Sequence, residues 1–159
     1  MSSVIRNLRN VFERETEDIS LRSRVVVYCS GCMFAIGWWL IFDVAVVYSS
    51  QGDFPHPYHA IGVVATVAFI MIVATPISDD YDGGLFNSPA TSRFIIFTGF
   101  MIGFSCVIAA VWIMFQDYVK FKGHLSAWPG VALFLQNLLI FSSAVIWKIG
   151  RRDNDYLAL

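Results

Sequence analysis

Four long apolar stretches, separated by short polar segments, dominate the pattern of this chain. They cover residues 25–48, 60–77, 94–115 and 129–149. Each is close to the roughly 20 residues that a helix needs to cross the ~30 Å hydrocarbon core of a bilayer. The segments between them contain Gly, Pro and charged residues, which are typical of loops. The pattern therefore predicts an all-α membrane protein, built as a four-transmembrane-helix bundle.

The positions of the basic residues predict how this bundle is oriented. Lysine and arginine in short flanking segments are retained on the cytosolic side of a membrane. Nine of them lie before the first span, between the second and third spans, or at the C-terminal end, whereas only Lys120 and Lys122 lie elsewhere. We therefore expect both termini in the cytosol. The expected parts are a cytosolic amphipathic segment (residues 1–24), the membrane domain (residues 25–149) and a cytosolic tail (residues 150–159).

The segment before the first span has a helical pattern of its own. Its apolar residues Val4, Leu8, Val11 and Phe12 recur at helical spacing, with charged residues on either side. This arrangement predicts a short amphipathic helix that lies on the cytosolic leaflet. A partly ordered, charged lead-in is the alternative interpretation.

The composition agrees with a membrane protein and narrows the function classes. Hydrophobic residues make up 57% of the chain and charged residues 14%, against about 45–50% and about 25% in soluble domains. The net charge of −1 gives no reason to expect nucleic acid as a partner. No nucleophile with a base and no metal-ligand set occurs at usable spacing, so we expect no enzyme, no cofactor and no metal. The expected partners are the lipid bilayer and other membrane proteins.

Asp43 is the one acidic residue in the first span, and a carboxylate within a membrane needs partners. Counted along the helices from their lumenal ends, Asp43, Thr66, Gln136 and Asn137 reach similar depths. We expect these four residues to form one hydrogen-bonded cluster that fixes the register of the helices. The alternative is that Asp43 is the working carboxylate of a transporter or channel subunit. The cytosolic half of the spans offers only Ser, Thr and Cys to continue such a path, which favours the first interpretation.

The third span carries small residues on one face. Gly99 and Gly103 form a GxxxG motif, and Cys106 and Ala110 continue the same face. Small residues at this spacing let helix backbones approach closely within a membrane. The pattern predicts a helix-packing interface, either inside the bundle or with another subunit.

The loop after the first span contains Asp53, His56 and His59 at spacings of three. Side chains of these types can bind a metal, but Pro55 and Pro57 prevent the helix that would align them. We therefore favour an interfacial role for the rings of this loop over a metal site.

Two further short motifs allow more than one interpretation. Cys29 and Cys32 form a CxxC motif inside the first span, where thiols behave as small apolar groups, and reversible acylation near the cytosolic face is the alternative to packing. The tail ends in Tyr156-Leu-Ala-Leu159, a pattern that sorting adaptors can bind as an extended peptide.

A wider likeness extends over about residues 37–151. It lies in the segments GWWLIFDVAVVY, YHAIGVVATVAFIM, FTGFMIGFSCVIAAVWIMF and PGVALFLQNLLIFSSAVIWKIGR. Together these segments resemble the eukaryotic transmembrane protein 50 family, to which fungal vacuolar protein sorting protein 68 is related. One departure is Val73, which stands where the animal members lead us to expect an amide side chain.

The resemblance implies a small four-span protein of endosomes, vacuole, Golgi or endoplasmic reticulum, with no established enzymatic activity. The fungal relative acts in endosome-to-vacuole sorting together with vacuolar protein sorting protein 55, a four-span protein of the leptin-receptor-overlapping-transcript family. The expected function is therefore that of a scaffold or complex subunit in membrane trafficking, which binds a partner of this type. The positions carried over from the family as structural or partner-facing are Trp38, Trp39, Asp43, His59, Gly62, Gln136, Asn137 and Gly150.

Overall fold

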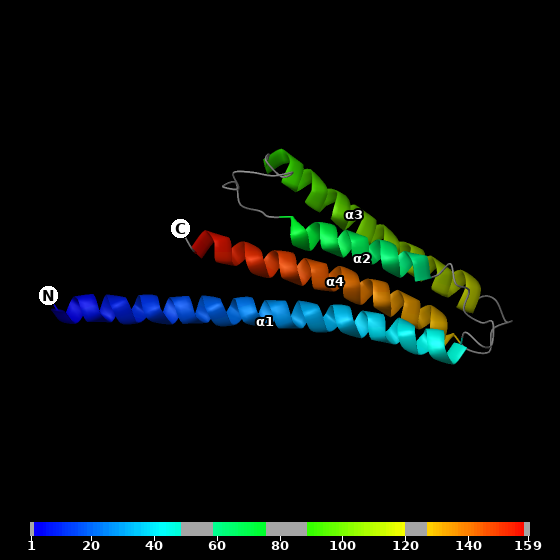
Figure 1. Cartoon of the computed structure of the whole chain (residues 1–159), viewed down its shortest axis with the longest axis horizontal. Helices are drawn as coiled ribbons and strands as arrows, with labels where there is room; N and C mark the ends of the chain where they lie inside the picture. Colours follow the sequence, from blue (N-terminus) through cyan, green and yellow to red (C-terminus); the bar gives the residue numbers. More distant parts are fainter. Residues whose placement is uncertain (1, 49–58, 76–88, 120–126, 158–159) are drawn as a thin grey trace.

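Four long helices make up the fold. The computed structural model describes residues 2–48, 59–75, 89–119 and 127–157. These residues form α1 (Ser2–Tyr48), α2 (His59–Ala74), α3 (Pro89–Ile113) with a π-helical continuation η3 (Met114–Val119), and α4 (Trp128–Leu157). Successive helices run in opposite directions, so that α1 begins and α4 ends toward the same end of the bundle (Figure 1). The all-α fold class is confirmed.

Three of the helices are long and apolar enough to cross a membrane. They contain the segments Leu21–Tyr48, Ala90–Gln116 and Trp128–Gly150, which correspond to the first, third and fourth predicted spans. α2 is apolar but has 16 residues, which corresponds to about 24 Å at 1.5 Å per residue. The second span, at residues 60–77, therefore stays a prediction, and so does the cytosolic location of both termini.

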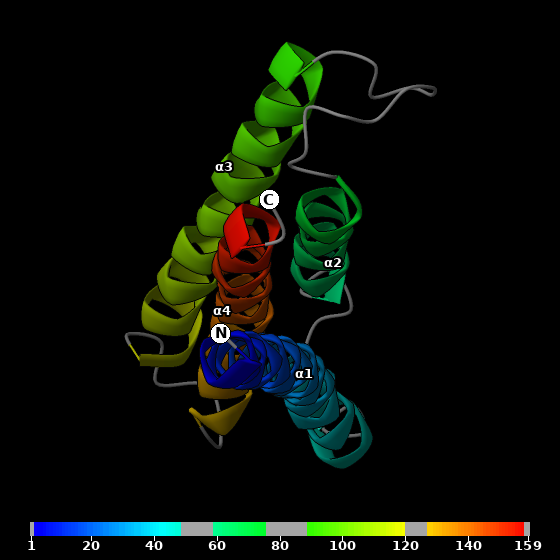
Figure 2. The ribbon, with the colours of Figure 1, turned by 90° about the vertical axis from the view of Figure 1, so that its left-hand side faces the viewer.

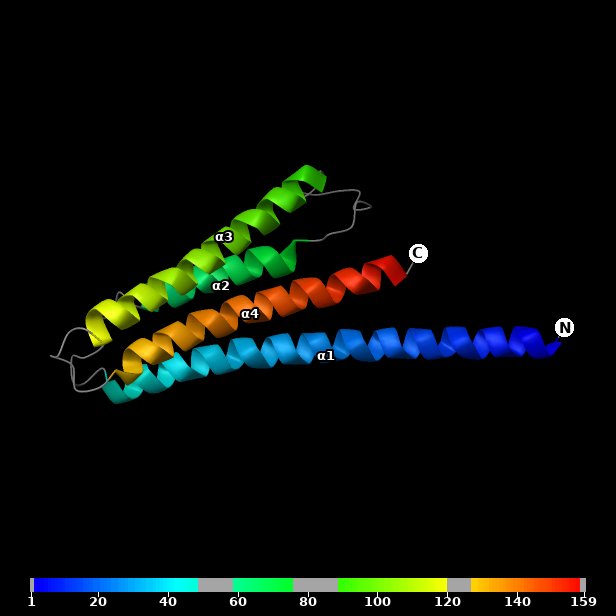
Figure 3. The ribbon, with the colours of Figure 1, turned by 180° about the vertical axis from the view of Figure 1, so that it is seen from behind.

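α1 is longer than the predicted first span. Residues 2–20 are helical and continue into the span without a break, so they do not form a separate short helix (Figures 1 and 3). The sequence explains this continuity, because the first Gly or Pro of the chain is Gly31 and no residue before it interrupts the backbone hydrogen bonds of a helix. The expected location of this segment on the cytosolic leaflet stays a prediction.

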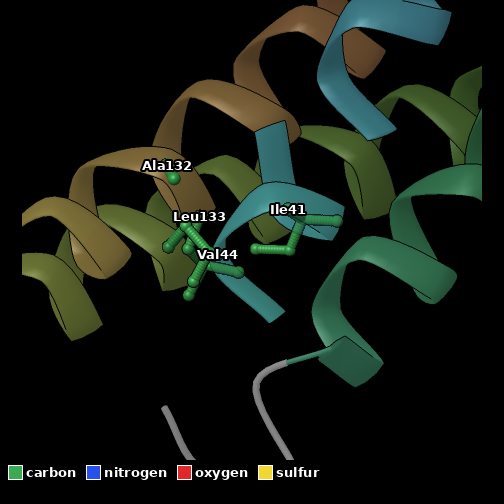
Figure 4. Close-up of a cluster of buried hydrophobic side chains, with 5 residues drawn as sticks. Ile41, Val44, Ala132 and Leu133 are labelled. Atoms are coloured by element: carbon green, nitrogen blue, oxygen red, sulfur yellow. The ribbon is translucent and has the colours of Figure 1, made fainter. Parts of the chain in front are cut away.

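α4 is the central helix of the bundle and packs against each of the other three (Figure 2). α1 packs mainly along α4, while α2 and α3 pack against each other and against α4. One core cluster joins α1, α3 and α4, and Figure 4 labels four of its side chains. It consists of Ile41, Val44, Ala110, Ala132 and Leu133. A second core cluster joins Ala65, Cys106 and Ile140. This second cluster therefore lies where α2, α3 and α4 meet.

Candidate functional site

Two adjacent amides of α4 lie in the interior of the bundle. Gln136 and Asn137 are 1% and 0% exposed. Asn137 Nδ2 donates a hydrogen bond of 2.8 Å to the carbonyl oxygen of Leu133, one turn earlier in the same helix. Within the described residues, Oε1 of Gln136 and Oδ1 of Asn137 accept no hydrogen bond. A buried acceptor without a donor costs about 1–3 kcal/mol, so the apolar interior contains two destabilising polar atoms.

Glycines of α1 and α2 surround the Gln136 residue. A Cβ atom added at Gly62 would lie 2.5 Å from Nε2 and 2.9 Å from Oε1 of Gln136, so the side-chain amide packs directly on the α2 backbone. A Cβ atom added at Gly37 of α1 would lie 3.2 Å from the backbone oxygen of Gln136. The absence of side chains at these two positions allows both helices to approach α4 closely.

Side chains also connect α1 to α2 near this point. Trp38 Nε1 donates a hydrogen bond of 3.2 Å to Thr66 Oγ1. The Thr66 hydroxyl in turn donates to the carbonyl oxygen of Gly62 at 2.8 Å. The rings of Phe34 and Phe69 stack with their centroids 4.8 Å apart. Trp38, Gly62, Thr66 and Gln136 therefore form a contact between α1, α2 and α4, which we call the three-helix junction.

Asp43 lies outside this junction. Its side chain is exposed, while Ile41 and Val44 on the adjoining face of α1 are buried at 1% and 0% exposure. No hydrogen bond or ion pair of Asp43 is found among the described residues. The predicted four-residue cluster is thus not assembled around Asp43, because similar depth does not require two side chains to point the same way. Gln136 and Asn137 face inward and Asp43 faces outward.

The small-residue face of α3 packs within the chain. All four of its members are buried, namely Gly99, Gly103, Cys106 and Ala110. A Cβ atom at Gly99 would lie 2.8 Å from Ile72 Cγ1 of α2, and one at Gly103 would lie 2.9 Å from Phe141 Cδ2 of α4. This face therefore brings α3 against two neighbouring helices of the same protein.

Lys148 of α4 contacts the end of α2, which was not predicted from the sequence. Its Nζ atom donates hydrogen bonds to the carbonyl oxygens of Thr75, at 2.7 Å, and of Ile72, at 3.2 Å. Both carbonyls lie at the C-terminal end of α2, where the helix itself provides no donors and where a cation is favoured. In the sequence, Lys148 is one of the nine basic residues that predict the orientation of the bundle. Lys148 lies near the end of the fourth apolar stretch and Thr75 near the end of the second, and both of these predicted spans run toward the same side of the membrane; this was the signal that could have revealed the contact.

Two contacts join α1 to α4 in the same half of the bundle as Lys148. Ser30 Oγ donates a hydrogen bond of 2.9 Å to the carbonyl oxygen of Ser143, and both residues are buried. A Cβ atom added at Gly150 would collide with the side chain of Val26, whose Cγ1 would lie 2.6 Å away. Gly150, one of the positions carried over from the family, therefore permits the close approach of α1 and α4.

The remaining candidate residues are scattered. Trp39 is 75% exposed, His59 is half-buried at the start of α2, and Cys29 and Cys32 are both exposed on α1. Tyr156 lies within α4. Asp53, His56 and Leu159 lie outside the described residues, so the interpretations of the first loop and of the sorting motif stay predictions.

Comparison with known proteins agrees with the resemblance seen in the sequence. The pattern of a family described as "Uncharacterised protein family (UPF0220)" matches residues 6–156. The chain is 33% identical over 141 residues to "Transmembrane protein 50 homolog" of Dictyostelium discoideum, over 80% of this chain and 90% of that protein. No solved structure matches the chain.

Proposed function

The chain belongs to the transmembrane protein 50 family and matches the pattern of the uncharacterised protein family UPF0220, and from this premise we propose that it is a non-enzymatic membrane scaffold. It binds another membrane protein through its helices and acts as a subunit of a complex in endosomal or Golgi trafficking. The expected partner is a four-span protein of the vacuolar protein sorting protein 55 type. This assignment of pathway and partner rests on the likeness to the fungal sorting proteins.

The outward position of Asp43 is the observation that carries the proposal. A carboxylate within a membrane span normally faces the interior of a bundle or a polar partner, because contact with lipid is costly. In this protein the side chain is exposed on α1 and points away from the buried residues of the bundle. A group in that position is placed to contact another molecule in the membrane.

The alternative function, a transporter or channel subunit that uses Asp43, has less support. Transport through the bundle needs polar groups across its full depth. On the predicted cytosolic side of Gln136 and Asn137, the described interior contains Ile140, Ala144 and Ile72, each 1% exposed. Two of its buried serines, Ser30 and Ser143, donate their hydroxyl protons to backbone carbonyls, and no buried carboxylate or amide follows them within the described residues. Asp43 is not directed toward that interior. The geometry therefore favours binding of a partner over conduction.

Purification of the tagged full-length protein from its own membranes in a mild detergent tests the proposal. We expect a stable complex that contains a four-span membrane protein, and we expect the tagged protein in endosomal or Golgi fractions. The variant Trp39→Ala removes an exposed side chain of α1 and should reduce the recovered partner. The control Val63→Ala changes an exposed side chain of α2 and should not reduce it. Recovery of a monomer alone, under conditions that preserve other membrane complexes, contradicts the proposal.

A further inference from the structure

α1 has two opposite faces with different environments. The inner face contains the buried residues Ser30, Gly37, Ile41 and Val44, which pack toward α4. The opposite face contains exposed residues at alternating spacings of three and four, which we call the outer stripe. It consists of Val25, Cys29, Cys32, Ile36, Trp39, Asp43 and Val46, all exposed. This spacing has the 3.5-residue period by which two helices pack along each other.

The neighbouring helices show how deep Asp43 lies. Ile41 and Val44 pack in the same cluster as Ala132 and Leu133, which follow the start of α4 by four and five residues. This corresponds to about 6–8 Å below the end of α4 at 1.5 Å per residue. Long lysine and arginine side chains can reach the interface from such a depth, but the aspartate side chain is much shorter. The outer stripe thus presents a carboxylate at a level where acyl chains cannot satisfy it.

We propose that the outer stripe binds a transmembrane helix of a different protein, and that this helix places a lysine or arginine side chain opposite Asp43. The inference rests on the proposed function and adds the surface and the chemistry of the partner. A cation is the expected counterpart because a charge-assisted hydrogen bond is stronger than a neutral one. A second copy of this chain is a poor occupant, because a two-fold contact along the stripe brings Asp43 near Asp43 of the other copy.

The other residues of the outer stripe fit a helix in this position. Trp39 is 75% exposed and lies one turn from Asp43, so it offers a large surface beside the ionic contact. Cys29 and Cys32 are small and lie toward the cytosolic end, where they allow a neighbouring backbone to come close. The stripe therefore combines a region of close approach with a single charged position.

A synthetic transmembrane peptide tests this chemistry without knowledge of the natural partner. The full-length protein is reconstituted in phosphatidylcholine vesicles with a leucine-rich peptide that carries one lysine about 8 Å from one end, a depth taken from the helix rise. Binding is measured by energy transfer between labels on the loops of the protein and on the peptide. We expect at least tenfold tighter binding than for the peptide with leucine in place of lysine, and no such gain when the lysine is moved to the opposite half.

Variants of the protein separate the ion pair from general packing. Asp43→Leu and Asp43→Asn should abolish the preference for the lysine peptide, and Asp43→Glu should retain it. Because Asp43 is exposed, these changes should leave the helix content and the elution volume of the protein unchanged. The control variant Ile108→Ala changes an exposed residue of α3 and should keep the full preference.

Four results would overturn the inference. The first is equal binding of the lysine and leucine peptides, and the second is a preference that survives Asp43→Leu. The third is Asp43-dependent energy transfer between two labelled copies of the protein. That result assigns the outer stripe to self-association. The fourth is a native complex that survives Asp43→Leu, a result that leaves the proposed function in place. Absence of any native complex, together with lysine-dependent peptide binding, refutes only the proposed function.

Discussion

The substitution Gly99→Ala tests the packing of α3 against α2. The added Cβ atom would lie 2.8 Å from Ile72 Cγ1, 3.3 Å from the carbonyl oxygen of Ala68 and 3.4 Å from Met71 Cβ. The Ile72 side chain is 1% exposed and has little space to move. The carbonyl of Ala68 belongs to the helix backbone and cannot move without a shift of α2. The new methyl group therefore requires the two helices to separate.

The expected magnitude combines two opposing effects. Overpacking a well-packed interior costs about 1–3 kcal/mol, whereas replacing glycine by alanine in a helix contributes up to about 1 kcal/mol through better helix propensity. For Gly99→Ala the packing cost is the larger, and we expect a net loss of about 1–2 kcal/mol in the free energy of unfolding. Gly31→Ala is the matched control, because a Cβ atom at Gly31 has no neighbour within 4 Å. It should leave stability unchanged or raise it.

Equilibrium unfolding in mixed detergent micelles measures both variants. Increasing fractions of sodium dodecyl sulfate unfold the protein, and the fluorescence of its five tryptophans reports the transition. The midpoint should fall for Gly99→Ala and stay or rise for Gly31→Ala. If both midpoints shift in the same direction by the same amount, then α2 and α3 do not pack as closely at Gly99 as the structure shows, and the reasoning is refuted.

The same unfolding assay tests three contacts of α4. Lys148→Met removes the donor to the carbonyl of Thr75 and should lower the free energy of unfolding by about 1–3 kcal/mol, as for hydrogen bonds to charged groups. Lys148→Arg keeps a cationic donor and should retain most of this stabilisation. An unchanged midpoint for Lys148→Met contradicts the contact. Ser30→Ala removes the buried bond to α4 and should cost about 0.5–1 kcal/mol, by analogy with measured hydrogen bonds between membrane helices. Its control, Ser105→Ala, affects an exposed hydroxyl bonded within its own helix and should be neutral, so equal losses for the two serine variants contradict the expectation. Gln136→Leu removes Oε1, an acceptor without a donor among the described residues, and should leave the free energy of unfolding within about 1 kcal/mol of that of the native protein. A loss above about 3 kcal/mol would show that this oxygen has a donor.

The length and apolar character of the spans were readable from the sequence, since a helix that crosses a bilayer must be apolar for about 20 residues. The structure confirms three of these segments as helices of sufficient length. It also extends the first helix back to Ser2. The charges of residues 1–24 differ from those of the span and favour a separate segment, but a change of solvent does not itself end a helix. A helix ends where its backbone hydrogen bonds are interrupted, and no Gly or Pro precedes Gly31 in this chain.

The direction in which Asp43 points could not be predicted in the same way. Depth follows from counting residues, whereas direction depends on which face of the helix packs in the bundle. In soluble proteins the polar face of a helix identifies its outer side. Around Asp43 both faces of α1 are apolar, with Ile41 and Val44 inside and Trp39 and Val46 outside, so the residue types do not distinguish them. Only the packing of α1 on α4 determines the direction.

The buried amide of Gln136, whose Oε1 atom accepts no hydrogen bond among the described residues, indicates how a bundle of apolar helices acquires one helix register. Aliphatic side chains pack almost equally well after a helix shifts by one turn, about 5.4 Å, so they specify register weakly. The Gln136 amide packs on α2 at Gly62, where a Cβ atom would collide with it. A shift of one turn toward the C-terminal end of α2 would place the amide near Thr66 or Ala65, both of which have side chains. Because the free space at Gly62 occurs once along this face, the amide selects one register of α2 against α4, and its destabilising effect is consistent with a role in specificity.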